Sequence, residues 1–92
     1  MSVIDKLAAL VEQLYVESET YSENPSDVQL WYNRGYANGI VSFLNARGHT
    51  DKINHLKLDA EDLYNGEQVR EWHKAYNHGF KMGLRESSEV MH

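Results

Sequence analysis

The side chains that most often carry out chemistry are present in this sequence, but their spacing does not suit a reaction. The chain has no cysteine, which excludes thiolate catalysis, disulfides and cysteine-ligated zinc. No serine stands in a Gly-x-Ser-x-Gly turn, the arrangement that exposes a nucleophilic hydroxyl. His73 and His78 are five residues apart, so on a helix they face different directions, whereas zinc-binding histidines four apart share a face. We therefore expect no catalytic residue, no metal site and no cofactor.

Carboxylate pairs are present, but in polar surroundings. Glu61-Asp62 and the pair Glu67 and Glu71 lie in strongly hydrophilic stretches. Acid–base catalysis requires a carboxyl group whose pKa is raised by burial. The sequence thus predicts that the protein is not an enzyme.

Charge is divided unevenly along the chain, and its division suggests a binding role. Residues 1–27 carry six acids and one lysine, and residues 59–71 carry five acids and one arginine, whereas residues 28–58 carry four bases and one acid. Such segregation favours encounter with a basic protein, although an acidic surface can also serve solubility alone. The candidate partner-binding residues are nine of the eleven acids in the two acidic segments: Glu17, Glu19, Glu23, Asp27, Asp59, Glu61, Asp62, Glu67 and Glu71.

Glycines paired with aromatic residues recur in two predicted helices. Each pair is spaced four residues apart and leaves a bare strip on one helix face, where another backbone can approach closely although glycine costs about 1 kcal/mol in a helix. The strips either pack helices together, within the chain or against a second copy, or open a cleft whose aromatic walls bind a nucleotide-type ligand. The residues of this pattern are Trp31, Gly35, Tyr36, Gly39, Trp72, Tyr76, Gly79 and Gly83.

The elements that would position these residues are helical. Apolar residues spaced three and four apart predict a helix over 3–17. Asn24-Pro25 predicts the start of a second helix over 25–47, and Gly48 its end. A third long helix is expected over 67–86, a short one near 59–65, an irregular or briefly helical stretch over 49–58, and a frayed tail over 87–92. The prediction is one all-α domain spanning residues 1–92.

Length and composition narrow the function classes further. Ninety-two residues make one small domain with modest burial, which favours a homodimer or higher oligomer. A formal net charge of −5 argues against direct binding of duplex DNA. No run of 18 apolar residues occurs, so we expect a soluble cytoplasmic protein without a membrane span.

The chain is small and acidic, has no cysteine and carries a Tyr-x-x-Gly pattern at Tyr36–Gly39 and Tyr76–Gly79. In these features it resembles small phage-encoded early proteins that bind and inhibit host factors or defence systems. The resemblance implies an inhibitor that acts by occupying a host protein through an acidic, aromatic-rimmed surface, in the host cytoplasm. The basic middle segment departs from strict DNA mimicry. The alternative function is a helical oligomer that binds a small nucleotide-type ligand.

Overall fold

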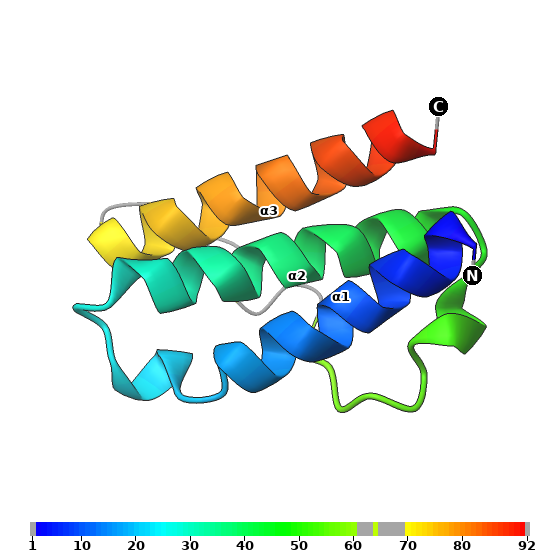
Figure 1. Cartoon of the computed structure of the whole chain (residues 1–92). Coiled ribbons are helices and arrows are strands. Elements are labelled where there is room, and N and C mark those ends of the chain that lie inside the picture. Colours follow the sequence, from blue (N-terminus) through cyan, green and yellow to red (C-terminus); the bar gives the residue numbers. More distant parts are fainter. Residues whose placement is uncertain (1, 61–63, 65–69, 92) are drawn as a thin grey trace.

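Three long helices form the protein, and the middle one contacts both others. The computed structural model describes residues 2–60, 64 and 70–91. Its long helices are α1 (Val3–Glu17), α2 (Val28–Ala46) and α3 (Glu71–Val90), and two short 3₁₀ helices are η1 (Tyr21–Glu23) and η2 (Thr50–Lys52). Figure 1 shows α2 between α1 and α3. The described residues contain no strand, so the predicted all-α fold class is confirmed.

Helix α1 matches its predicted bounds because its first turn is capped. The Ser2 hydroxyl accepts a hydrogen bond from the backbone N–H of Asp5 at 3.1 Å. The Asp5 carboxylate lies in the same turn, where it complements the positive end of the helix. The capped turn fixes the start of the apolar face that carries the buried residues Leu7 and Val11.

Helix α2 begins three residues later than expected. The Asn24 side chain donates to the Thr20 carbonyl at 2.8 Å, so it faces back toward η1 and cannot cap the next helix. Asp27 takes that role and accepts from the Leu30 N–H. At the other end Gly48 has φ +79°, and the N–H of His49 donates to the Leu44 carbonyl at 2.8 Å. This is the glycine stop that the sequence predicts.

Helix α3 differs from its predicted bounds at both ends. It starts at Glu71, and residues 67–69 lie outside the described part of the chain. It continues to Val90, and Ser87 is buried, so residues 87–90 belong to the helix and not to a frayed tail. The short helix expected near 59–65 falls largely on residues that are not described; Asp59 and Ala60 are not helical. Within 49–58 only η2 is helical.

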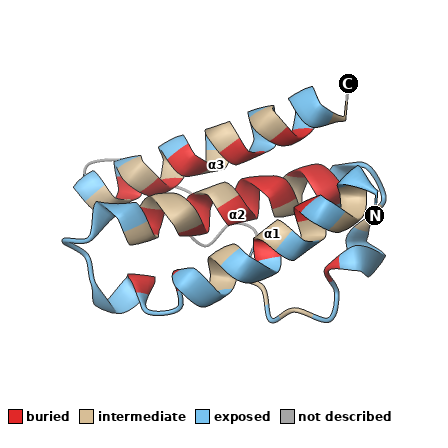
Figure 2. Cartoon of the chain, in the orientation of Figure 1, coloured by how far each residue is buried: buried red, intermediate tan, exposed pale blue. Residues whose placement is uncertain are grey.

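The core has two parts, and Figure 2 shows its buried residues where the helices face one another. One part joins α1 to the second half of α2 and to Ile53, through Leu7, Val11, Ile40, Phe43 and Leu44. The other joins η1, the first half of α2 and α3 through Tyr21, Trp31 and Tyr76. None of the described helices is long and apolar enough to cross a membrane.

The glycine strips lie between α2 and α3 of the same chain. A β-carbon added at Gly35 would overlap the backbone carbonyl oxygen of Tyr76, and one at Gly79 would overlap that of Tyr32. Gly39 and Gly83 meet the carbonyls of Phe80 and Tyr36 in the same way. The strips therefore bring two backbones together and leave no room between them for a ligand or for a second copy of the chain.

Candidate functional site

An acidic end forms where α1 stops and where α2 and α3 start, on the left of Figure 1. Its described carboxylates are all exposed. No ion pair joins any of them to another described residue, although the exposed bases Arg70 and Lys74 lie at the start of α3. The acidic end comprises Glu17, Glu19, Glu23, Asp27 and Glu71.

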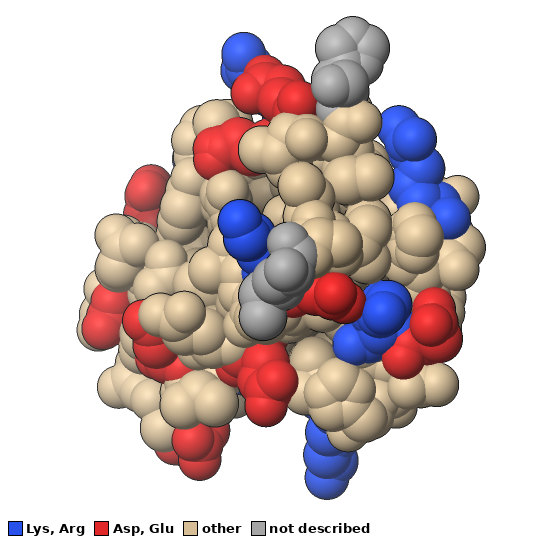
Figure 3. Space-filling view, turned by 45° about the vertical axis from the view of Figure 1, so that its right-hand side comes forward, with Lys and Arg blue, Asp and Glu red and all other residues tan. Residues whose placement is uncertain are grey.

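Charge elsewhere on the surface is more mixed. Figure 3 shows basic side chains mainly at the centre and right of that view, interspersed with acidic ones, while the left margin carries only acidic side chains among the charged residues. At the opposite end of the molecule Asp5 pairs with Lys52 at 3.2 Å, and Glu89 pairs with Arg85 at 3.0 Å. Carboxylates without a paired base thus concentrate at the acidic end.

Of the remaining four candidate partner-binding residues, Asp59 does not join this surface and three lie outside the described residues. Asp59 points inward: its Oδ2 accepts from the Asn38 side chain at 3.0 Å and lies 3.8 Å from the Arg34 guanidinium. Its carboxylate balances a buried charge and does not present itself to a partner. The other three, Glu61, Asp62 and Glu67, lie outside the described residues.

The candidate aromatic residues are buried or half-buried and do not form an exposed rim around the acidic end. Trp31 is 4% exposed and Tyr76 7%, while Trp72 and Tyr36 are half-buried. The rings of Trp31 and Trp72 lie 4.2 Å apart between centroids. Such ring contacts contribute core packing of about 0.5–1.5 kcal/mol per pair beyond area burial. The contact between Trp31 and Trp72 stabilises the packing of α2 against α3.

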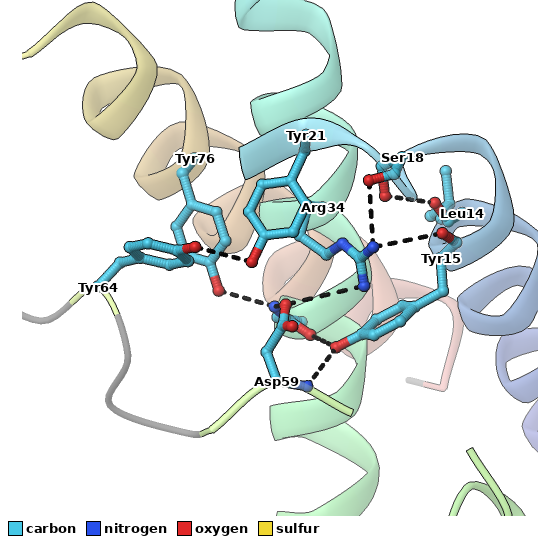
Figure 4. Close-up of polar contacts among 9 residues, drawn as sticks. Leu14, Tyr15, Ser18, Tyr21, Arg34, Asp59, Tyr64 and Tyr76 are labelled. Carbon is cyan, nitrogen blue, oxygen red and sulfur yellow. Dashed lines mark hydrogen bonds and ion pairs between the residues drawn. The ribbon is translucent and has the colours of Figure 1, made fainter. Parts of the chain in front are cut away.

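Arg34 is a buried charge that contacts α1, η1 and Asp59 near the acidic end (Figure 4). It is 6% exposed. Its Nη2 donates to the carbonyls of Tyr15 at 3.3 Å and Ser18 at 3.1 Å, and its guanidinium carbon lies 3.8 Å from the Tyr15 ring centroid and 4.6 Å from that of Tyr21. Helix α1 has no base in its own last turn. Arg34 therefore supplies the cation that a helix C-terminus favours.

Asn38 connects the three helices through side-chain hydrogen bonds. Its Oδ1 accepts from the Tyr15 hydroxyl, and its Nδ2 donates to Tyr76 at 2.7 Å and to Asp59. The Tyr15 hydroxyl in turn accepts from the Asp59 backbone N–H at 3.1 Å. Both N–H groups and the carbonyl oxygen of the Asn38 amide are thus hydrogen-bonded. Residues from α1, α2, α3 and the segment before residue 60 are fixed together.

Tyr64, which precedes α3 in the chain, contacts residues of this network through its hydroxyl, its ring and its backbone carbonyl. Its hydroxyl lies 2.8 Å from that of Tyr21, and its ring packs edge-on against Trp31 and Tyr76. Its backbone carbonyl contacts His73 Nε2. Residues from η1, α2 and α3 therefore converge on one tyrosine.

Burial of the network raises the pKa of its tyrosines. Desolvation raises the pKa of Tyr76 to about 12 and also raises those of Tyr15 and Tyr21. Tyr36 is raised to about 12 by burial and by its hydrogen bond to Glu86. An unfolded tyrosine ionises near pH 10, so a group with a higher pKa in the fold stabilises it below pH 10 and loses that contribution as pH rises through the folded value.

We therefore expect the melting temperature to fall between pH 10 and pH 12. Circular-dichroism melts paired with tyrosinate absorbance measure both events. The two should coincide for the buried tyrosines, because ionisation and unfolding are linked. If all six tyrosines ionised near pH 10 while the helices persisted, the buried network would be contradicted.

Sequence reasoning singled out Asp59 and Tyr76 of this network but not Tyr15, Arg34 or Asn38. A partial signal was present, because Arg34 and Asn38 are four residues apart on the helix face that begins with Trp31. Polar residues on an otherwise buried face call for partners. The partners, however, are carbonyls and a carboxylate from other elements, which spacing along one helix cannot supply.

The described residues contain no group of three or more histidine or acidic side chains placed to hold a metal ion. Comparison of the chain with protein-family models, with curated proteins and with solved structures gives no match. The proposals below accordingly rest on this chain's own geometry.

Proposed function

We propose that this chain is a noncatalytic binding protein whose acidic end occupies a basic surface of another protein and blocks it. The observation that carries the proposal is the set of exposed carboxylates at one end, none of which has a paired base among the described residues. Like charges gathered on one surface repel each other, and a basic partner relieves that repulsion as it binds.

The surroundings of the acidic end also suit an interface. Val16 is 67% exposed, more than any other large apolar side chain described, and it lies in the last turn of α1 beside Glu17. An open groove next to it is lined by Val16, Glu19, Tyr21 and Leu56, among others. Protein interfaces typically have an apolar centre surrounded by polar and charged residues.

The resemblance to small phage-encoded inhibitors adds the expected class of partner, a bacterial host protein. A nucleic-acid-binding or defence protein presents the basic face that an acidic end fits, because such faces bind phosphates. The inhibitor would then act by occupancy alone. The alternative function, binding of a nucleotide-type ligand between the glycine strips, is not favoured, because the backbones of α2 and α3 fill that space.

The test is a capture experiment with charge-matched variants. Glu17→Gln/Glu19→Gln removes two carboxylates from the acidic end, and Asp51→Asn/Glu89→Gln removes two exposed ones from the opposite end, so both variants have the same net charge. With bacterial lysate at about 50 mM salt, where screening is weak, the wild type and the second variant should retain the same partner and the first should lose at least about 80% of it.

Equal retention by both variants, or no partner retained by the wild type, would count against the proposal. About 500 mM salt should release the partner from the wild type, because screening weakens contacts between exposed charges.

A further inference from the structure

A small, partly open cavity shares the lining residues Leu58 and Asp59 with the groove beside Val16. Its volume is about 130 Å³, and it lies between α2, α3 and the segment at residues 58–60. This is close to the roughly 150 Å³ at which an apolar protein cavity accepts a benzene molecule. The size therefore suits a ligand of one ring. The wall consists of Asn38, Val41, Ser42, Asn45, Leu58, Asp59, Ala60, Tyr76 and Phe80.

The polar groups of this wall are fixed by the network but have hydrogen-bonding capacity that the described residues do not use. Asn38 donates to both Tyr76 and Asp59 Oδ2. The Tyr76 hydroxyl thus accepts a bond but donates none to a described residue, and Asp59 Oδ1 accepts none. The Asn38 amide nitrogen bonds both the Tyr76 hydroxyl and Asp59 Oδ2, so these two oxygens lie about 5 Å apart by ordinary hydrogen-bond geometry. The unused Oδ1 belongs to the same carboxylate as Oδ2.

The cavity also has apolar surface against which a ring can pack. Phe80, Val41 and Leu58 line it together with the hydroxyl of Ser42. Ser42 makes no side-chain hydrogen bond to a described residue. The wall thus combines polar side chains, which can orient a ligand, with an apolar surface against which a ring can pack.

We propose that this cavity binds a small planar heterocycle that carries an N–H donor and a carbonyl or ring-nitrogen acceptor, as the edge of a pyrimidine base does. The N–H group of the ligand donates a hydrogen bond to Asp59 Oδ1, and its acceptor atom accepts one from the Tyr76 hydroxyl. The ring of the ligand packs against Phe80. The site is independent of the acidic end and of the glycine strips, so its failure leaves the proposed function standing.

Thermal shift with cytosine and uracil as probes, each at about 10 mM, tests the proposal, with benzene as the apolar comparison. We expect cytosine or uracil to raise the melting temperature by about 5 °C, given the shift that weak ligands produce in a domain of this size, and benzene to raise it by less than 1 °C. Amide chemical shifts should move at Ser42, Asn45 and Tyr76.

Two variants localise the effect. Tyr76→Phe keeps the ring and removes only the hydroxyl, and should weaken the dissociation constant of the pyrimidine about tenfold. Ser42→Leu fills the cavity and should abolish the shift, whereas Ser88→Leu, the same change at an exposed position on α3, should keep it. No shift with either pyrimidine, an equal shift with benzene, or an unchanged dissociation constant in Tyr76→Phe would overturn the proposal.

Discussion

Gly35→Ala should lower the free energy of unfolding by about 3 kcal/mol, and Gly35→Ala/Gly79→Ala should leave the chain largely unfolded. The added methyl groups would overlap the carbonyl oxygens of Tyr76 and Tyr32. Overpacking a close contact typically costs 1–3 kcal/mol and sometimes more. The contact here is with backbone, which cannot rotate away, so the cost exceeds the gain of about 1 kcal/mol in helix propensity. Urea unfolding followed by circular dichroism measures it.

Gly48→Ala is the matched control for this prediction. Gly48 has φ +79°, and nothing lies within 4 Å of the β-carbon position. An alanine there pays only for the left-handed backbone conformation, about 1–2 kcal/mol. If Gly35→Ala proved no more destabilising than Gly48→Ala, the close approach of α2 and α3 at the glycine strips would be contradicted.

Arg34→Met should destabilise the protein by about 3–5 kcal/mol, the usual result of breaking a buried ion pair by removing one partner. The substitution removes the hydrogen bonds from Arg34 to the carbonyls of Tyr15 and Ser18 and the positive charge beside the Asp59 carboxylate. Arg34→Lys should recover little, because one ammonium group cannot reproduce the planar fork between two tyrosine rings. Urea unfolding at pH 7 gives the difference.

The exposed arginine Arg85 provides the comparison. It pairs only with Glu89, four residues on, and Arg85→Met should cost less than about 0.5 kcal/mol. Arg34→Met/Asp59→Asn should be less destabilised than the sum of its single variants by about 1 kcal/mol, since the two side chains interact. Strict additivity would show that the buried pair contributes nothing.

The long helices could be predicted because each has a local signal. The helix over 3–17 has both a periodic apolar face and a serine cap. Gly48 ends α2 because glycine readily adopts the positive φ that is needed there. The start of α2 could not be predicted in the same way. Asn24 and Asp27 are both good caps, and the choice between them depends on Asn24 bonding back to Thr20.

The candidate site was only partly accessible to sequence reasoning. Exposed acids in the polar stretch from Glu17 to Asp27 follow from composition, and the structure gathers them with Glu71 at one end. Asp59 has the same residue type and an equally polar neighbourhood in sequence, yet it balances Arg34 inside the protein. Which acid stays exposed and which faces a buried base is decided by tertiary contacts, and these are not encoded in local spacing.

Zero-length carbodiimide crosslinking of the captured complex tests the central claim most directly, since the reagent joins a carboxylate of this chain to a lysine of the partner without a spacer. The account predicts that mass spectrometry will find the linked peptides at Glu17, Glu19 and Glu23. Links confined to carboxylates of the opposite end, such as Asp51 and Glu89, would contradict it.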